Sequence, residues 1–497
     1  MMPLDLNRWP QALQLLAALA LGGLSVLAYA PFELGLLALF TLAGLLHLLW
    51  HARSPAHAAL MGYAFGLGLL GFGVSWLRIS INQFGGVSPA LAITFTGLFV
   101  AIVALYFGLA AWLAKRVAQR QSHRVFMLVL APAAWLSVEW LRAWLFTGFP
   151  WLSLGYSQID LPLAGYAPLF GVYGTGAVLV LSAGLLNLWG RIWPALLLLL
   201  IWATGLALNG LEWTRPVGEK IPVSLVQGNI PQADKWQRHL FAPSVRLYRE
   251  LTAQVPDSKL VIWPETAIAA FDDEVEDAVL QPLHALLQSQ GRDLLTGIVS
   301  RDPDGRYYNA MISLGVSGRD DYRKRHLVPF GEYLPLKWLL DPVLDFLHIP
   351  MSDISAGNGA KPLIPLAGSL AGVDICYEDA FADEVLRALP EAGFLVNASN
   401  DAWFGDSLAP HQHLQIARMR ALESGRYLLR ATNTGISAVI GPRGQLLGTA
   451  PQFQQRVLSD RIQPMQGMTP FARWGDWPLL GLALLLLLLA GYRQARP

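Results

Sequence analysis

Cysteine is nearly missing from this sequence of 497 residues, in which Cys376 is the single residue of its type. One thiol excludes an intramolecular disulfide, and it also excludes metal sites built from several cysteines. Such a side chain is either a small buried apolar group or a reactive thiol. Cys376 is therefore a candidate nucleophile.

Charge is also scarce, at 14% of the chain against roughly 25% in an ordinary soluble domain. Hydrophobic residues make up 54%, which excludes a simple soluble enzyme. The net charge is +1 and the basic residues form no long run, so we expect no nucleic-acid partner. Residues 1–210 hold only 13 of the 71 charged residues, which indicates two different physical environments.

Eight stretches are apolar and long enough to be candidate membrane spans, since a helix needs about 20 apolar residues to cross the hydrocarbon layer. They cover residues 11–30, 33–50, 58–77, 89–114, 125–146, 166–189, 193–210 and 476–492. The first has an alternative interpretation, because Ala28-Tyr29-Ala30 resembles a signal-peptide cleavage site. We predict a membrane domain of seven helices over 1–210, a catalytic domain over 211–470, and a last helix with a short cytoplasmic tail over 471–497.

Basic residues in the short connections set the expected orientation, because Lys and Arg concentrate on the cytoplasmic side. One side collects Arg8, Arg53, Lys115, Arg116, Arg120, Arg124, Arg191, Arg493 and Arg496. Both termini should then be cytoplasmic, and the segment from about 211 to 475 should lie on the outer face. In a Gram-negative cell this is a multi-pass protein of the inner membrane with its large domain in the periplasm.

Glu139 and Arg142 are an ionisable pair within one span, spaced i, i+3 on one helical face. They either contact a lipid headgroup or neutralise each other and orient the helix, and the second interpretation is favoured.

The segment 219–463 alternates strand-like and helix-like stretches and has ordinary globular composition. Apolar strands are predicted at 221–226, 259–263, 293–299, 372–375 and 393–397. Helices are predicted at about 242–254, 273–290, 380–389 and 411–424. An α/β layered domain follows, large enough to build a core without disulfides.

Three predicted strands end with side chains that carry chemistry, at the position where α/β sheets place their ligand sites. They are followed by Glu265, Lys324 and Cys376. A carboxylate, an ammonium and a thiol suffice for acyl transfer: Glu265 takes the thiol proton, Lys324 stabilises the negative charge, and Cys376 attacks the carbonyl. This chemistry needs no metal or cofactor.

Several blocks resemble the nitrilase superfamily, whose members use a Glu-Lys-Cys triad on an α-β-β-α sandwich. More closely, they resemble the apolipoprotein N-acyltransferases, the membrane-embedded family of that superfamily. The blocks are VQGNIPQ (226–232) with KW (235–236), WPET (263–266), KRHLVPFGEYLP (324–335), ICYE (375–378), SNDAWF (399–404) and RMRALE (418–423). The resemblance covers essentially the whole chain, including the eight predicted spans.

The resemblance implies roles for individual residues. Glu265 is the general base, Lys324 the electrostatic stabiliser and Cys376 the acyl-accepting nucleophile. Glu332 matches a further essential acid that orients the lysine or assists the oxyanion. Supporting residues complete the set: Tyr377 and Glu378 match a required pair after the nucleophile, and Trp236 matches a mobile-loop aromatic near the entrance.

The resemblance also implies the reaction and its partners. A membrane phospholipid donates its sn-1 acyl chain to Cys376, and the N-terminal amine of an S-diacylglyceryl cysteine at the start of an apolipoprotein then accepts it. Nothing requires more than a monomer. Two other classes stay open: a membrane-anchored nitrilase-type amidase or hydrolase that uses water in the second step, and a lipid-binding or transport protein with a silent outer domain.

Two further features have simpler interpretations. His411 and His413 suggest a metal or acid/base role, but hydrogen bonding at a helix start is favoured. The apolar stretch 334–351, which includes Leu339 and Leu344, either lies on the outer leaflet or packs in the ordinary way.

Overall fold

The computed structural model describes residues 9–334, 353–359 and 361–495. The chain forms two compact units: Met1–Arg78 with Pro89–Leu211 and Arg473–Pro497, and Ile79–Ser88 with Glu212–Ala472. Arg8, Arg496, Leu339 and Leu344, which entered the expectations on topology and lipid contact, lie outside the described residues.

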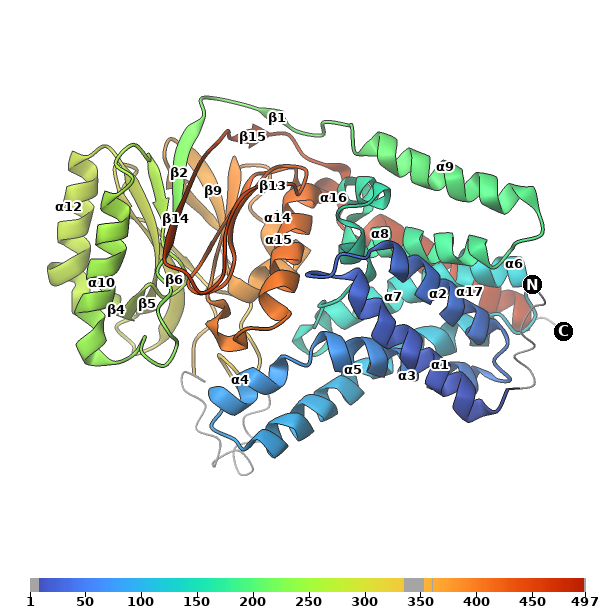
Figure 1. The fold of residues 1–497 in the computed structure, drawn as a ribbon. Coiled ribbons are helices and arrows are strands. Elements are labelled where there is room, and N and C mark those ends of the chain that lie inside the picture. The colour runs from blue at the N-terminus through green and yellow to red at the C-terminus, as the bar shows by residue number, and fades with distance from the viewer. Residues whose placement is uncertain (1–8, 335–352, 360, 496–497) are drawn as a thin grey trace. The chain divides into compact units, whose positions relative to one another are not determined.

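The first unit is built of helices (Figure 1), and most of them are apolar. Its longer helices are α1 (Gln11–Ser25), α2 (Leu36–Trp50), α3 (Pro55–Gly73), α5 (Pro89–Val117), α7 (Ala131–Trp144), α8 (Ala167–Leu186), α9 (Ile192–Leu208) and α17 (Trp477–Ala495). Short helical turns extend several of them, so that five continuous segments are long and apolar enough to cross a membrane. The stretches Leu36–Trp50, Ile192–Leu208 and Trp477–Arg493 are apolar but shorter. These helices identify a membrane protein, whereas the expected number of eight spans is not established.

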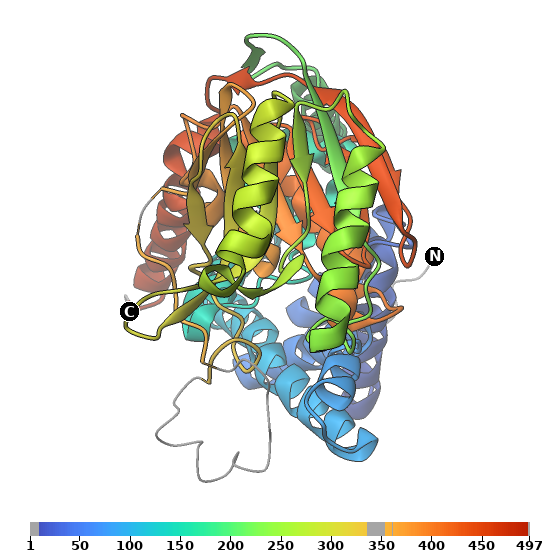
Figure 2. The same ribbon diagram turned by 90° about the vertical axis from the view of Figure 1, so that its left-hand side faces the viewer.

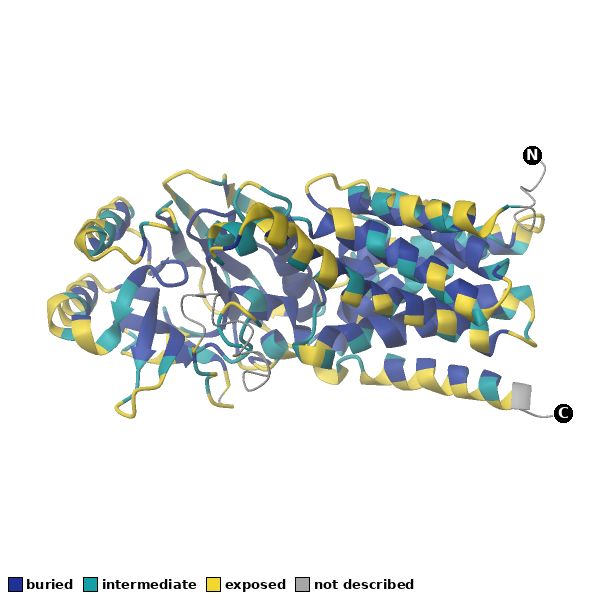
Figure 3. Ribbon diagram, turned by 90° about the horizontal axis from the view of Figure 1, so that it is seen from below, coloured by how far each residue is buried: buried dark blue, intermediate teal, exposed yellow. Residues whose placement is uncertain are grey.

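Exposed apolar side chains mark the outer surface of this unit. Helix α17 alternates buried and exposed positions along its length (Figure 3), with Leu480 and Leu487 buried and Leu488 71% exposed. Inside the unit, α3 and α5 approach closely at Gly62, where an added Cβ would lie 2.4 Å from the carbonyl oxygen of Phe107. Small residues permit this approach, as is usual between membrane helices.

Glu139 and Arg142 form a buried pair on α7, with Nη2 and Oε1 3.6 Å apart. Arg142 donates to the carbonyls of Phe149 and Trp151, at 2.6 and 2.8 Å. Glu139 Oε1 accepts from the amide of Leu154 at 2.9 Å. The pair therefore holds the loop that follows α7, which agrees with the favoured interpretation and leaves neither side chain exposed for a headgroup.

The second unit contains two sheets (Figure 1). The seven-stranded sheet has the order β14-β2-β3-β5-β6-β7, with β4 also paired to β5. Its strands are β2 (Ile221–Gln227), β3 (Leu260–Ile262), β4 (Ile268–Phe271), β5 (Asp293–Arg301), β6 (Tyr307–Gly315), β7 (Asp321–Arg323) and β14 (Arg456–Ile462). At its centre β2, β3 and β5 run parallel, so the carboxyl ends of these strands share one edge.

The six-stranded sheet has the order β13-β12-β11-β10-β9-β8. Its strands are β8 (Leu363–Leu366), β9 (Ser369–Ile375), β10 (Phe394–Ser399), β11 (Leu428–Thr432), β12 (Ser437–Ile440) and β13 (Leu446–Ala450). Strands β9, β10 and β11 are parallel and adjacent. A separate short pair joins β1 (Arg215–Pro216) to β15 (Met465–Gln466).

Helices cover the outer face of each sheet and complete an α-β-β-α sandwich. Helices α10 (Arg238–Ala253) and α12 (Gln281–Ser289) lie over the seven-stranded sheet, as Figure 2 shows. Helices α14 (Ala382–Leu386) and α15 (Ala409–Ser424) cover the other. Alternate residues of both sheets, such as Val223 and Val373, fill the apolar layer between them. The expected sandwich fold is confirmed.

Candidate active site

Cys376 begins a tight turn at the carboxyl end of β9. It is the first residue of the 3₁₀-helix η8 (Cys376–Ala380) and has φ +54°, a left-handed conformation that residues other than glycine seldom adopt. Such backbone strain persists only where surrounding contacts hold it, and it is common at functional sites. Burial, followed by the charge of Glu265, raises the pKa of the Cys376 thiol, while Lys324 opposes the shift. The thiol therefore needs a nearby base to become a nucleophile.

Lys324 follows β7 and is completely enclosed, with only 1% of its side chain exposed. Its Nζ lies 2.9 Å from Glu332 Oε1 and 3.9 Å from Glu265 Oε1. Burial alone would lower the pKa of Lys324, but the carboxylates of Glu332 and Glu265 outweigh it and raise this pKa. Lys324 is thus a fixed positive charge, suited to stabilising an anion and unsuited to giving up a proton.

Asn309 connects the two carboxylates from β6. Its Nδ2 donates to Glu265 Oε1 at 2.7 Å and to Glu332 Oε1 at 3.1 Å. Glu332 Oε2 accepts from the backbone amide of Val328 at 2.8 Å. Both oxygens of Glu332 are therefore occupied, which suits a residue that holds Lys324 in place.

The two carboxylate oxygens of Glu265 have different surroundings. Its Oε2 is buried and has no hydrogen-bond partner among the described residues. The loop that carries it packs on Gly297 of β5, where an added Cβ would lie 2.2 Å from the backbone nitrogen of Thr266. A buried carboxylate oxygen without a donor is the group that a general base requires.

A second lysine, Lys235, lies beside the same loop. It is 6% exposed, and its Nζ donates to the backbone carbonyl of Glu265 at 2.9 Å. Burial lowers the pKa of Lys235 to about 8, although Glu265 and Cys376 favour its charged form. The neighbouring Trp236 is 43% exposed, and both residues line a cavity of about 530 Å³.

Glu378 joins the turn at Cys376 to the segment after Lys324. Its Oε1 accepts from the hydroxyl of Tyr322 at 2.9 Å and from the amides of Arg325 and His326 at 2.8 and 3.0 Å. Its Oε2 accepts from the amide of Ile375 at 2.8 Å. Burial raises the pKa of Glu378 to about 7, against the charge of Lys324 and the three amides. This carboxylate thus ties together the segments that carry the cation and the thiol.

Tyr377 points its ring into an aromatic group. The ring lies edge-on to Phe381, with centroids 5.0 Å apart, and 6.0 Å from the ring of His326. Of the residues singled out in the sequence, Glu265, Lys324 and Glu332 are brought into direct contact, and Cys376 lies within their electrostatic reach. Glu378 is linked to them through backbone amides, whereas the ring of Tyr377 packs on Phe381 and Trp236 lines the cavity beside Lys235.

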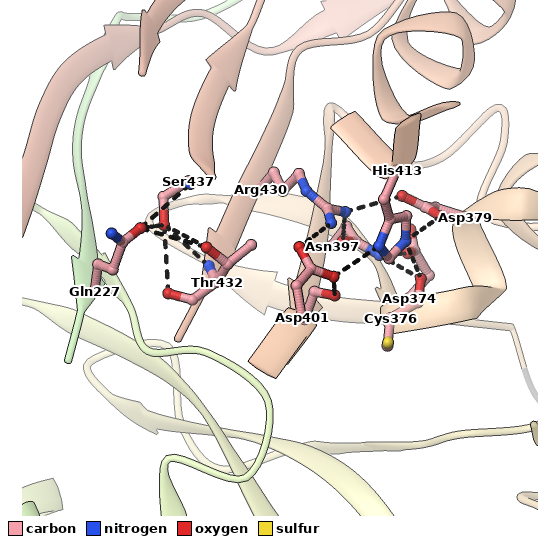
Figure 4. Close-up of polar contacts among 11 residues, drawn as sticks. Gln227, Asp374, Cys376, Asp379, Asn397, Asp401, His413, Arg430, Thr432 and Ser437 are labelled. Carbon is pink, nitrogen blue, oxygen red and sulfur yellow. Dashed lines mark hydrogen bonds and ion pairs between the residues drawn. The ribbon is translucent and has the colours of Figure 1, made fainter. Parts of the chain in front are cut away.

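Behind Cys376 lies a buried polar cluster on the side of the six-stranded sheet that faces α15 (Figure 4). It comprises Asp374, Asp379, Asn397, Asp401, His413 and Arg430. Asn309 and, apart from His413, the members of this cluster were not identified from the sequence. His411 and His413 do form hydrogen bonds near the start of α15, as favoured above. In the part of the chain that the structure describes, no group of three or more His, Cys, Asp and Glu side chains is arranged to hold a metal ion.

The sandwich, with an acid, a lysine and a cysteine at its strand ends, defines the carbon-nitrogen hydrolase class of fold, here in a chain with a membrane unit. Residues 222–467 match the family model described as carbon-nitrogen hydrolase. Residues 21–185 match the model described as the N-terminal domain of apolipoprotein N-acyltransferase.

Relatives extend the match to nearly the full length. The apolipoprotein N-acyltransferase of Methylococcus capsulatus is 48% identical over 476 residues, which cover 94% of each chain. That of Nitrosomonas europaea is 45% identical over 495 residues, covering 97% of this chain and 98% of the relative. The chain belongs to the apolipoprotein N-acyltransferase family, and it is an enzyme. The resemblance expected from the sequence motifs is confirmed.

Solved structures include similar proteins. Saccharomyces cerevisiae Nit3, a member of branch 10 of the nitrilase superfamily, is 21% identical and aligns with a TM-score of 0.39, covering 50% of this chain and 92% of Nit3.

Proposed function

We propose that this chain moves the sn-1 acyl chain of a membrane phospholipid to Cys376, and from there to the N-terminal amine of an S-diacylglyceryl-cysteine apolipoprotein, the last step of lipoprotein maturation. One observation carries the mechanism: Oε2 of Glu265 is buried without a hydrogen-bond partner among the residues that the structure describes, and this carboxylate lies beside Lys324 and acts on the charge of Cys376. The family membership supports the acceptor, since the relatives are named for apolipoproteins.

In the first half-reaction Glu265 Oε2 takes the thiol proton while the sulfur of Cys376 bonds to the ester carbonyl carbon. The ammonium of Lys324 stabilises the negative charge on the sulfur and on the carbonyl oxygen. The carbon–oxygen bond to the glycerol then breaks, and the proton on Glu265 passes to the leaving oxygen. The products are a thioester on Cys376 and a lysophospholipid.

In the second half-reaction an unprotonated amine bonds to the thioester carbon. Glu265 takes a proton from the nitrogen, the carbon–sulfur bond breaks, and that proton returns to the thiolate of Cys376. Glu265 thus takes up and returns one proton in each half-reaction, and the proposed mechanism uses no metal or cofactor. Glu332 holds Lys324 through its hydrogen bond, and Glu378 holds the turn. Trp236 and Tyr377 act at the margin, where the substrates pass.

The test is intact-mass analysis of the full chain and of Cys376→Ala after exposure to phospholipid in detergent micelles. We expect a fatty-acyl adduct on the wild type alone, which persists until a diacylglyceryl peptide with a free amine is added and then disappears. Absence of the adduct from the wild type would contradict the proposal. Loss of the adduct without peptide would instead identify a hydrolase, and transport that survives Cys376→Ala would identify a carrier.

We also propose the topology: a monomer in the inner membrane, seven spans over 1–210, a periplasmic domain over 211–470, and a last span with a cytoplasmic tail over 471–497. The basic loops support it through the positive-inside rule. In a Cys376→Ala background, Val316→Cys should react with a membrane-impermeant maleimide in spheroplasts. The control Gln119→Cys, which is also an exposed position, should react only after lysis. The reverse pattern would refute the orientation.

A further inference from the structure

We propose that His413 is a positioning residue for the acyl-transfer reaction: held as a buried imidazolium between two aspartates, it fixes the carbonyl of Cys376 and thereby the direction of the reacting thiol. The inference rests on the proposed function for the reaction step that it serves. Nothing in the triad accounts for a histidine at this place.

The cluster around His413 is assembled by the register of three parallel strands. Asn397 of β10 is paired with Asp374 of β9 on one side and with Arg430 of β11 on the other. Asn397 Nδ2 donates to Asp374 Oδ1 at 2.5 Å, and Arg430 Nη1 donates to Asn397 Oδ1 at 2.5 Å. These three side chains form a polar row below α15, from which His413 reaches toward Cys376.

The two nitrogens of His413 each face a carboxylate. Nδ1 lies 2.9 Å from Asp401 Oδ1, and Nε2 lies 2.9 Å from Asp379 Oδ1. A neutral imidazole carries one N–H, so one nitrogen would direct its lone pair at an acceptor oxygen. Both contacts are favourable only when both nitrogens carry a proton. His413 is 1% exposed, so water cannot take the place of either partner.

The charges of the cluster agree with an imidazolium. The charged side chains that face His413 come from three elements: Asp379 of η8, Asp401 of η9 (Asp401–Phe404) and Arg430 of β11. Arg430 bonds to both aspartates, at 3.1 and 3.0 Å. Two cations therefore balance two carboxylates. Burial and Arg430 lower the pKa of His413, but the two aspartates overcome them and raise it to about 9.

A second acid lies at the edge of the cluster. Asp374 is buried beside Asp379, and burial followed by the charge of Asp379 raises the pKa of Asp374 well above its ordinary value. Both effects favour the neutral form of Asp374, whose side chain accepts from Asn397.

The cluster acts on the nucleophile through one peptide group. The carbonyl oxygen of Cys376 accepts from Asn397 Nδ2 at 3.1 Å and faces His413 Nε2 at 3.3 Å. The peptide is planar, so fixing this oxygen fixes the opposite direction of the next N–H and the orientation of the residue that carries the thiol. Figure 4 shows the sulfur of Cys376 pointing away from the cluster. Cys376 also has φ +54°, a conformation that needs such external support.

The experiment compares His413→Gln with His411→Gln in the full chain. His411 lies on the same helix, and its Nε2 is 2.9 Å from Nε2 of Gln452, which is not a member of the polar cluster. The first readout is the rate of acyl-enzyme formation from phospholipid in micelles, resolved into kcat and KM. The second is the rate at which iodoacetamide alkylates the protein, which reports on Cys376 alone because the chain has one cysteine.

For His413→Gln we expect kcat of acylation to fall about 100-fold with KM unchanged, because the reacting group is misplaced while lipid binding is not affected. Alkylation at pH 7.5 should slow about tenfold. His411→Gln should match the wild type in both assays. A folded His413→Gln protein that acylates and alkylates at the wild-type rate would overturn the inference, as would an equal loss in His411→Gln.

Asp401→Asn is the second variant, and it serves where His413→Gln does not fold. It replaces the carboxylate at Nδ1 by a neutral amide, which weakens the pairing with the imidazolium. Loss of this charge also lowers the pKa of the Cys376 thiol, which alone would speed alkylation, so the slower rate that we expect reports on the position of the thiol. An unchanged or faster rate would also overturn the inference. Failure of the proposed function can be distinguished from failure of this inference. If the proposed function is wrong, the wild type forms no acyl adduct, but the alkylation rates of His413→Gln and His411→Gln still differ.

Discussion

Glu378→Gln tests how the turn at Cys376 is held. The carboxylate accepts four hydrogen bonds, three at Oε1 and one from the Ile375 amide at Oε2. An amide keeps the three by directing its oxygen toward Tyr322, Arg325 and His326. Its NH₂ group then faces the Ile375 N–H, and two donors oppose each other in a buried place.

The magnitude follows from these contacts. An unpaired buried amide costs about 2 kcal/mol. Burial raises the pKa of Glu378 to about 7 even though Lys324 and the amides favour the charged form, so near neutral pH the carboxylate gains little from its charge and its replacement by a neutral amide adds no further cost. We expect a net destabilisation of about 2 kcal/mol and a melting temperature lower by about 5 °C.

The matched control is Tyr322→Phe, which removes one of the four donors and leaves the carboxylate and the amides in place. It should cost about 1 kcal/mol. We would measure thermal unfolding by tryptophan fluorescence in detergent and acyl-enzyme formation by intact mass. Acylation should fall more than about tenfold in Glu378→Gln, because the Ile375 amide adjoins Cys376, and less than about threefold in Tyr322→Phe. A Glu378→Gln protein with wild-type acylation, or a Tyr322→Phe protein that is the more damaged, would refute the reasoning.

Three other predictions concern the same unit. Asn309→Asp brings a third acid against Glu265 and Glu332 and should slow acyl-enzyme formation about 100-fold. Asn309→Leu only removes a hydrogen-bond donor and should slow acyl-enzyme formation about tenfold. Equal rates in the two variants would contradict this prediction. Gly297→Ala would force its Cβ to within 2.2 Å of the backbone nitrogen after Glu265 and should destabilise the unit by about 3 kcal/mol, seen as a lower melting temperature. The pKa of His413 is raised from 6.5 to about 9, so its stabilisation of about 3 kcal/mol is complete below about pH 6.5 and is lost as pH rises through about 9. The melting temperature of the wild type should therefore fall between pH 7 and 10, and that of His413→Gln should fall less.

The sequence indicates the central strands because they are continuous apolar runs between turns. Strands β2, β3, β5, β9 and β10 all match predicted stretches. The outer strand β14 carries Arg456, Asp460 and Arg461, so its composition does not indicate a strand. It is held by pairing with β2, more than 200 residues away in sequence, which no local pattern reveals.

In the site, too, some residues can be predicted from the local sequence and others cannot. Glu265, Lys324 and Cys376 stand at strand ends beside recognisable motifs, so their chemistry can be predicted. Asn309 sits inside β6 among apolar neighbours and looks like an ordinary strand residue. The cluster around His413 depends on the register between neighbouring strands, which a local sequence pattern does not reveal. Helix α15 is buried on nearly every side despite its many polar residues, so its helical periodicity does not predict that His413 is buried.

In the proposed mechanism, groups from opposite halves of the sandwich must meet across the layer of apolar side chains between the two sheets. Glu265 and Lys324 extend from the seven-stranded sheet and Cys376 from the six-stranded one, with the apolar side chains of both sheets packed between. The thickness of that packing acts as a spacer that sets how far a proton must travel. Removing a methyl group from Val373 or Leu225, which lie in this apolar layer, should therefore change the turnover rate.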